Sequence, residues 1–214
     1  MVDAELLRCA GLFVMRDFLP VDLCARLRDE AARSRLHKAG IFRGEKILMD
    51  ERIRRTEGAC LPETLQSAID ERFQTIMPDL GRHFDHVLTG RQPAQLLAYQ
   101  RGSFFRPHQD NSGSSGLPPD VTDRLVSAVV FLGRQTRLPE PGSYCGGALT
   151  FFRLRGPGGT NRVRTEVWGE EGLLVAFPAT GTIHEVRPVT HGPRYSLVTW
   201  FTGGDRSEQD AGGT

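Results

Sequence analysis

Two histidines and one carboxylate in this chain have the types and spacing that suit a metal ion. His108 and Asp110 lie two residues apart in the segment FFRPHQD, and His184 lies in the later segment TIHEVRPV. In an extended strand, residues i and i+2 project from the same face, so His108 and Asp110 can point at one site. An H-x-D triplet alone is weak, and a lone histidine among apolar residues is usually a packed core residue. Together the three residues predict a metal site.

Two histidines and one carboxylate form the facial ligand set of non-haem Fe(II) sites. The three ligands cover one face of an octahedron and leave three positions open. Oxygen activation needs those positions, two for a bidentate co-substrate and one for dioxygen. We therefore expect His108, Asp110 and His184 to hold Fe(II).

Arg194, in the segment GPRYSLVTWF, is a candidate anion-binding residue. It follows His184 by ten residues, so a turn and a return strand would bring it back beside the metal strand. On that strand Arg194 and Ser196 share a face with Val198 and Trp200. A guanidinium and a hydroxyl on one apolar face suit a carboxylate, since a buried arginine without an anion costs several kcal/mol. Taken alone, Arg194 would be assigned to an exposed strand end.

The elements that must position these residues begin near residue 95. Short β-rich runs follow one another, separated by clusters of Gly, Pro and Ser. Their spacing predicts a sandwich or barrel such as a jelly roll. The predicted strands are QLLAY, FFRPHQ, LVSAVVFL, ALTFF, RVRTEVW, GLLVAF, TIHEVRPV and YSLVTWF.

The first third of the chain has helical periodicity. Residues 19–36 and 61–88 each carry an apolar stripe, and Pro78 should break or kink the second helix before a short piece near 80–88. The charged segment 37–57 between them predicts a hairpin or loop. Helices followed by strands in a chain of 214 residues predict helices packed on the outside of one β-core.

Composition narrows the class of protein. The chain is 39% hydrophobic, and its 27 Lys and Arg nearly balance 26 Asp and Glu, so nucleic acid and anionic membranes are not expected as partners. We expect a cytoplasmic protein, because the sequence shows neither a secretory signal nor a membrane span. The four cysteines should be free thiols, and the polar tail 204–214 should be flexible. The cysteines are Cys9, Cys24, Cys60 and Cys145.

The segment from Leu96 to Phe201 resembles the catalytic core of the prolyl-4-hydroxylase-like branch of Fe(II)/2-oxoglutarate oxygenases. The resemblance covers about half of the chain, with the motifs in the family's order and spacing. It implies one domain over residues 1–203, with supporting helices over about 1–94 and a double-stranded β-helix (jelly-roll, cupin-like) core over about 95–203. The matching motifs are Tyr99 in LLAYQRG, HQD, Arg124 in RLVSAVVFL, GGALTFF, GLLVAFP, HEVRPV and GPRYSLVTWF.

The resemblance also implies individual roles. The metal triad would bind Fe(II), Arg194 and Ser196 would hold the distal carboxylate of 2-oxoglutarate, and Tyr99 would hydrogen-bond to this co-substrate. Trp200 would pack the pocket wall. One position departs from the family pattern: many members carry a tyrosine that contacts the distal carboxylate where this chain has Phe131. Ser196 could supply the missing donor.

The implied activity is hydroxylation of an unactivated C–H bond, with succinate and carbon dioxide as co-products and ascorbate as a candidate reductant. A prolyl residue of a peptide or protein is the expected substrate, and a free amino acid or other small molecule is the alternative. Segments 37–57 and 111–123 should line the entrance. Three other classes stay open: a jelly-roll metalloenzyme that uses the same ligand set without 2-oxoglutarate, a zinc hydrolase, and a non-catalytic metal-binding β-sandwich. A zinc hydrolase needs a general base, and Glu185 next to His184 should point to the opposite face of its strand as a surface or supporting residue. The sequence does not indicate an oligomeric state.

Overall fold

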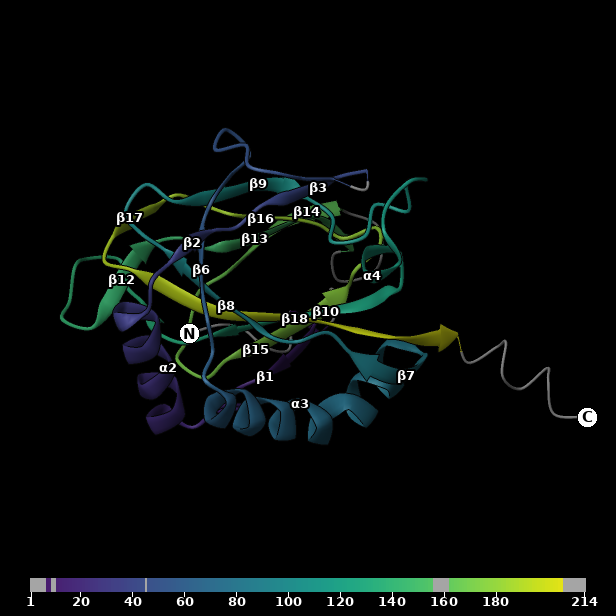
Figure 1. The fold of residues 1–214 in the computed structure, drawn as a ribbon, viewed down its shortest axis with the longest axis horizontal. Helices are drawn as coiled ribbons and strands as arrows, with labels where there is room; N and C mark the ends of the chain where they lie inside the picture. Colours follow the sequence, from purple (N-terminus) through teal and green to yellow (C-terminus); the bar gives the residue numbers. More distant parts are fainter. Residues whose placement is uncertain (1–6, 9–10, 45, 156–161, 206–214) are drawn as a thin grey trace, which may run out of the picture.

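Two facing β-sheets form the centre of the molecule (Figure 1). The computed structural model describes residues 7–8, 11–44, 46–155 and 162–205. The larger sheet pairs β1 (Phe13–Met15), β15 (Leu174–Pro178), β10 (Arg124–Phe131), β18 (Arg194–Asp205), β8 (Gln95–Tyr99), β6 (Glu57–Ala59) and β2 (His37–Lys38) in this order, and β7 (His86–Arg91) joins β18. The smaller sheet pairs β14 (Arg162–Val167), β13 (Leu149–Arg155), β16 (Ile183–Val186), β9 (Phe104–His108) and β5 (Arg54–Arg55).

Short elements close the ends of the two sheets. A small sheet at one end contains β11 (Arg134–Gln135), β12 (Ser143–Gly146) and β17 (Val189–His191), a hairpin contains β3 (Ile41–Arg43) and β4 (Lys46–Leu48), and the loop after β9 contains α4 (Pro119–Thr122). Each predicted strand run contains an observed strand, with TIHEVRPV divided between β16 and the start of β17. Strands β1, β7 and β12 arise from segments where no strand was predicted.

The alternation of side chains along β10 shows how the sheets bury two cores. Val126, Ala128 and Val130 face the helices, whereas Val129 and Phe131 face the smaller sheet. Successive side chains of a strand point to opposite faces of the sheet, which divides these residues into two groups. The sequence of β10 is almost continuously apolar because both faces of the sheet are covered. The predicted mainly-β core with supporting helices is therefore confirmed.

Helices α2 (Val21–Arg33) and α3 (Glu63–Phe84) cover the outer face of the larger sheet (Figure 1). Both helices turn a stripe of fully buried apolar residues to this sheet, including Leu27 on α2 and Ile69 and Phe73 on α3. Each such side chain contributes about 1.5–3 kcal/mol by its burial. This packing restricts the movement of the larger sheet and so fixes the positions of the residues on its inner face.

Two predicted boundaries are wrong. α3 continues through Pro78 to Phe84, and residues from 86 onward belong to β7. Pro78 lies on the exposed side of α3, so the carbonyl that loses its hydrogen bond can be hydrated, while the apolar stripe continues on the other side. β18 extends to Asp205 by pairing with β7, past the expected end at 203. The rest of the predicted flexible tail, 206–214, lies outside the described residues.

Among the described helices, none combines the length and apolar character needed to cross a bilayer. Cys24, Cys60 and Cys145 are free thiols, as predicted, and Cys9 lies outside the described ranges.

Candidate functional site

Pairing between β9 and β16 brings the predicted metal triad together. His108 ends β9 and lies directly opposite His184 on β16, and Asp110 follows β9 by two residues. Asp110 Oδ1 is 3.5 Å from His108 Nε2 and 3.8 Å from His184 Nε2. All three potential ligand atoms lie within 4.8 Å of one another. Two imidazole nitrogens and one carboxylate oxygen at these separations are within reach of a single metal ion.

Backbone carbonyls orient both imidazoles toward Asp110. His108 Nδ1–H donates to Arg106 O at 2.8 Å, and His184 Nδ1–H donates to Thr182 O at 3.2 Å. A carbonyl can only accept, so in each ring Nδ1 carries the proton and Nε2 presents its lone pair to the site. The backbone thus selects the tautomer that binds a metal.

Aromatic side chains enclose the triad. The His108 ring stacks on Phe105 with centroids 3.5 Å apart, and the Phe177 ring centroid lies 4.6 Å from that of His184. His184 is only 4% exposed, and burial with the nearby His108 lowers its pKa to about 4. Burial raises the pKa of Asp110, but the protonated forms of His184 and His108 outweigh this effect and lower it overall. At neutral pH the site therefore offers neutral His184 and an ionised carboxylate.

We expect the metal-free protein to lose stability as the pH falls from 6.5 to 4. The pKa of His184 is lowered from 6.5 to about 4 on folding, so in this window the unfolded chain binds a proton that the folded chain does not. The free energy of unfolding should fall by up to about 3 kcal/mol from this group. Urea unfolding with a chelator at pH 7 and pH 4.5 measures the loss. A His184→Gln variant should show a smaller loss, and an equal loss would contradict the assignment.

Arg194 reaches the same cavity from the other sheet. The sequence placed it beside the metal strand, but β18 pairs with β8 and β10 in the larger sheet, whereas the histidines belong to the smaller sheet. The prediction that Arg194 lies on a strand next to the metal strand is therefore wrong, although the chain after β16 does return to the same cavity. Arg194 faces the triad across the space between the sheets, and both line one cavity of about 950 Å³.

The Arg194 guanidinium is buried without an anionic partner in the described part of the chain. The residue is 1% exposed, and Nη1 donates to Ser196 Oγ at 3.1 Å. Nε and Nη2 have no hydrogen-bond partner among the described residues. The rings of Tyr99 and Phe131 lie 4.8 and 5.1 Å from the guanidinium carbon. Aromatic faces compensate a buried cation only in part, so this end of the cavity favours an anionic ligand.

Further predicted residues line the cavity. Tyr99, Ser196, Val198 and Trp200 are all at its wall. Arg124 lies 3.8 Å above the Trp200 ring and donates to the backbone oxygens of Asp120 and Asp110.

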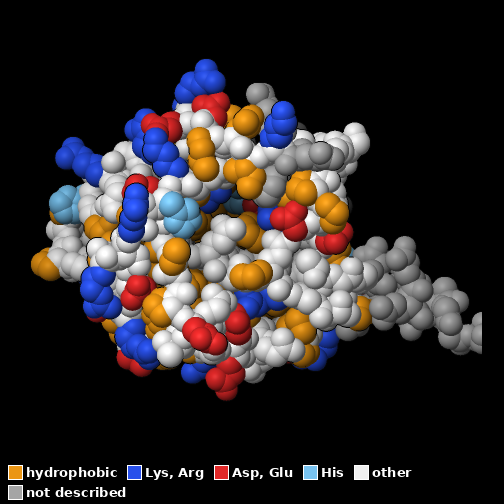
Figure 2. Space-filling view, viewed as in Figure 1, with side chains coloured by type: hydrophobic (Ala, Val, Ile, Leu, Met, Phe, Trp, Pro, Cys, Tyr) orange, Lys and Arg blue, Asp and Glu red, His pale blue; other side chains and the backbone are white. Residues whose placement is uncertain are grey.

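Both predicted entrance segments also contribute to the cavity. Residues Gly40, Ile47, Met49 and Arg54 come from segment 37–57, and Ser112, Leu117 and Asp120 come from segment 111–123. The space-filling view shows the molecule hollowed between the sheets, with hydrophobic, basic and acidic side chains around the mouth (Figure 2).

Two residues at the site were not predicted individually. Arg54 was only one of several basic residues in segment 37–57, but β5 pairs with β9 and places its guanidinium 4.7 Å from the Phe105 ring. Tyr144 lies in a segment predicted as a turn, yet it is fully buried on β12. Glu185 was predicted to point away from the metal ligands; its half-buried side chain pairs with Arg187 at 3.4 Å and does not line the cavity.

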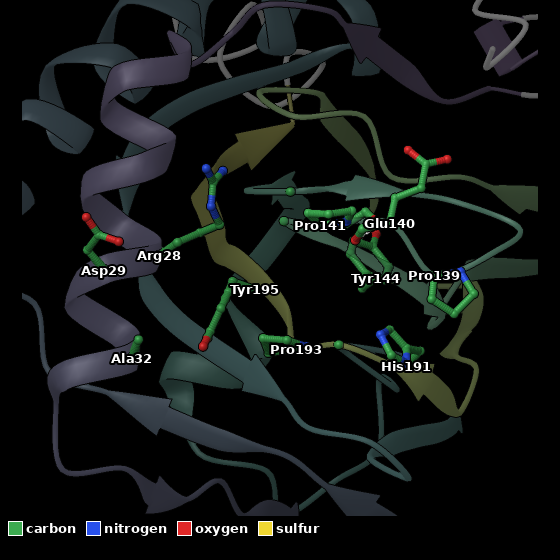
Figure 3. A pocket seen from close by; sticks show the side chains of 14 residues that line it. Arg28, Asp29, Ala32, Pro139, Glu140, Pro141, Tyr144, His191, Pro193 and Tyr195 are labelled. Atoms are coloured by element: carbon green, nitrogen blue, oxygen red, sulfur yellow. Dashed lines mark hydrogen bonds between the residues drawn. The ribbon is translucent and has the colours of Figure 1, made fainter.

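A second cavity, of about 620 Å³, lies outside the space between the sheets (Figure 3). Arg28 and Asp29 of α2 lie on one side, Glu140 and Tyr144 lie on the other, and Tyr195 lies between them. Arg28 is already paired with Glu171, and Glu140 with Arg134. Two of the charged side chains that line this cavity, Arg28 and Glu140, therefore already have partners within the described residues.

Comparison with known proteins adds a family assignment. Residues 94–202 match the sequence profile of the 2OG-Fe(II) oxygenase superfamily. A PKHD-type hydroxylase of Pseudomonas putida is 28% identical over 146 residues, which cover 67% of this chain and 57% of the relative. A PKHD-type hydroxylase of Xanthomonas euvesicatoria pv. vesicatoria is 32% identical over 153 residues, which cover 67% of this chain and 60% of the relative. The chain thus spans less than two thirds of the length of these two relatives.

Solved structures share the fold. A Pseudomonas putida prolyl-4-hydroxylase matches with a TM-score of 0.61 and 25% identity, over 94% of this chain and 96% of that chain. A Trichoplax adhaerens prolyl hydroxylase, solved with a peptide of the hypoxia inducible factor, matches with a TM-score of 0.68 and 17% identity, over 99% of this chain and 90% of that chain. These similarities confirm the predicted double-stranded β-helix core.

Proposed function

Because the chain belongs to the 2OG-Fe(II) oxygenase superfamily, we propose that it is an Fe(II)- and 2-oxoglutarate-dependent hydroxylase. One observation carries the proposal: a single cavity joins a His-Asp-His cluster to a buried guanidinium, two of whose nitrogens have no hydrogen-bond partner in the described part of the chain. 2-Oxoglutarate has a chelating 2-oxo acid at one end and a carboxylate at the other. Such a ligand satisfies both ends of this cavity, whereas a metalloenzyme without 2-oxoglutarate leaves Arg194 unexplained.

The proposed roles follow from the donor set. His108, Asp110 and His184 hold Fe(II) through two neutral imidazoles and one carboxylate, a set that suits this ion. Arg194 and Ser196 hold the distal carboxylate. Tyr99, next to Arg194 on the neighbouring strand β8, hydrogen-bonds to the co-substrate.

When bound, the iron supplies the oxidative chemistry, in which dioxygen and 2-oxoglutarate are consumed, one oxygen atom enters a substrate C–H bond, and succinate and carbon dioxide leave. The chain's residues orient and protect this reaction. Arg194 fixes one end of the co-substrate, and the rings of Phe105, Phe151 and Phe177 keep water from the triad. The low pKa of His184 keeps its imidazole neutral and available as a ligand at neutral pH.

A prolyl residue of a peptide or protein is the proposed substrate. Ile47 and Met49 line the cavity and are 60% and 58% exposed, so an apolar surface borders the mouth. An extended peptide could place a prolyl ring inside and cover these side chains. The likeness to a Pseudomonas putida prolyl-4-hydroxylase at 25% identity supports this choice.

A small carboxylate substrate, such as a free amino acid, is the second candidate. Arg54 favours it, because this half-buried residue lines the cavity and its buried Nε has no hydrogen-bond partner within the described ranges. Its Nη1 already donates to Gly40 O at 2.9 Å, so a ligand carboxylate would complete its contacts.

We expect Fe(II)-loaded protein to convert 2-oxoglutarate to succinate in air, with faster turnover in the presence of its substrate. Proline-containing peptides and free proline, tested side by side, separate the two substrate candidates by succinate release and by a mass gain of one oxygen atom. Without oxygen, Fe(II) and 2-oxoglutarate should give a weak visible charge-transfer band. A folded, iron-loaded protein without this band would contradict the proposal.

Several features of the proposal rest on the sequence alone. They are the location in the cytoplasm, ascorbate as the reductant, the absence of nucleic acid and membrane partners, and the arrangement of the chain as a single domain, whose last strand ends at Asp205 and not at residue 203.

A further inference from the structure

Three buried polar atoms without a hydrogen-bond partner belong to two neighbouring side chains, Arg194, which lines the cavity between the sheets, and Tyr144, which lies between Arg194 and the second cavity. They are Arg194 Nε, Arg194 Nη2 and Tyr144 Oη, none of which has a hydrogen-bond partner among the described residues. Both side chains are 1% exposed. A buried donor left unpaired costs about 1–3 kcal/mol, and more when it is charged, so a group of such donors indicates a missing acceptor.

We propose that Tyr144 donates its hydroxyl to the distal carboxylate of 2-oxoglutarate, beside Arg194. The inference rests on the proposed function. It adds Tyr144 as a hydroxyl donor to the distal carboxylate, a role that the sequence led us to expect from Ser196. Tyr144 would be a co-substrate-binding residue and a determinant of which 2-oxo acid is accepted.

Two glycines show how Tyr144 reaches this place. A Cβ at Gly147 would lie 2.9 Å from Arg194 Cδ and 3.4 Å from Tyr144 Cε2, so both side chains pass over this residue. A Cβ at Gly169 would lie 2.0 Å from Tyr144 Oη and 2.8 Å from Phe131 Cδ1. The hydroxyl therefore lies beside Phe131, whose ring also packs against Arg194. Side chains larger than glycine at either position would remove the space that Tyr144 occupies.

The electrostatics of the two side chains fit a shared anion. Burial raises the pKa of Tyr144 to about 12, although the charge of Arg194 and its close approach to the hydroxyl oppose this shift; the approach does not have the geometry of a hydrogen bond. The hydroxyl therefore stays protonated at neutral pH and can only gain by donating to an acceptor. Phe131 offers no donor, and Ser196 Oγ already accepts from Arg194 Nη1, with its own proton free for the same carboxylate.

The test compares two co-substrates in the absence of oxygen. Fe(II)-loaded protein is titrated with 2-oxoglutarate and with 2-oxobutyrate, which keeps the chelating end but lacks the distal carboxylate, and the charge-transfer band reports each Kd. Tyr144→Phe should raise the Kd for 2-oxoglutarate by about 10-fold to 100-fold, the range for a hydrogen bond to a charged group. The Kd for 2-oxobutyrate should stay unchanged, which also shows that the variant is folded.

Tyr195→Phe is the matched control, because Tyr195 lines the second cavity as Tyr144 does, but packs in the core between the larger sheet and the helices (Figure 3). This variant should bind both acids as the unmodified chain does. The midpoint of urea unfolding for metal-free Tyr144→Phe should be unchanged or raised, since an unpaired hydroxyl is removed; a purely structural hydroxyl would lower it instead.

The outcomes separate the two proposals. No band in the unmodified protein would overturn the proposed function itself. A normal band with an equal 2-oxoglutarate Kd in Tyr144→Phe, or an equal weakening of both acids, would overturn the role of Tyr144 and leave the proposed function intact.

Discussion

An Asp110→Asn variant is expected to lose Fe(II) binding and 2-oxoglutarate turnover together. Asn is nearly isosteric, so the fold is kept, but the carboxylate between His108 and His184 becomes a neutral amide. Since even residues that only orient metal ligands change affinity by 10–100-fold, the loss of a ligand charge should weaken Fe(II) binding by at least about 100-fold. Competition with a chromogenic Fe(II) chelator measures the affinity, and succinate release measures the turnover.

Glu185→Gln is the matched control for that variant. Glu185 is adjacent to a triad histidine, yet it pairs with Arg187 and does not line the cavity. We expect unchanged Fe(II) affinity and turnover. Loss of activity in Glu185→Gln with normal activity in Asp110→Asn would reverse the roles and favour hydrolytic chemistry with Glu185 as the base.

An Arg194→Met variant is expected to bind 2-oxoglutarate more weakly without a loss of stability. Losing one partner of a buried charged pair costs about 2–5 kcal/mol in binding, so the Kd for 2-oxoglutarate should rise by about 30-fold or more. The free energy of unfolding of the ligand-free protein should be unchanged or higher by about 1 kcal/mol, because an unpaired buried charge is replaced by an apolar side chain. Oxygen-free titration of the charge-transfer band and urea unfolding measure the two effects.

Arg187→Met provides the comparison for a surface arginine. The Arg187 side chain is 47% exposed, and an exposed ion pair contributes little. Neither the Kd for 2-oxoglutarate nor the free energy of unfolding should therefore change measurably in Arg187→Met. If Arg194→Met binds 2-oxoglutarate normally but unfolds more easily, then Arg194 is a structural cation held by Tyr99 and Phe131, and the distal carboxylate binds elsewhere.

The strands and the metal triad could be predicted because their sequence patterns are local or repeat every two residues. The two-residue spacing of His108 and Asp110 and the apolar alternation of the late strands survive in the structure. The sequence also indicated that Arg194 needs an anion, since an arginine on an apolar face has a cost whatever the topology.

Other features depended on pairing between distant segments, which the sequence does not display. The sheet to which β18 belongs decides that Arg194 lies opposite the triad, and spacing from His184 cannot reveal this. Tyr144 was hidden in a Gly- and Pro-rich stretch that has the composition of a turn, although β12 pairs there with β17. The continuity of α3 through Pro78 depends on which side of the helix faces water.

The division of the site between two sheets has a consequence for the length of the co-substrate. Facing sheets pack about 10 Å apart, and close-packed side chains between them resist compression. On the proposed function, the span between the metal end and the carboxylate end is therefore fixed by the thickness of the core, including Val167 and Val175, which do not line the cavity. A 2-oxo diacid with one methylene fewer or more would reach only one end well. Discrimination among homologous diacids would then be a property of core packing, so conservative substitutions between the sheets could change it while every contacting residue stays the same.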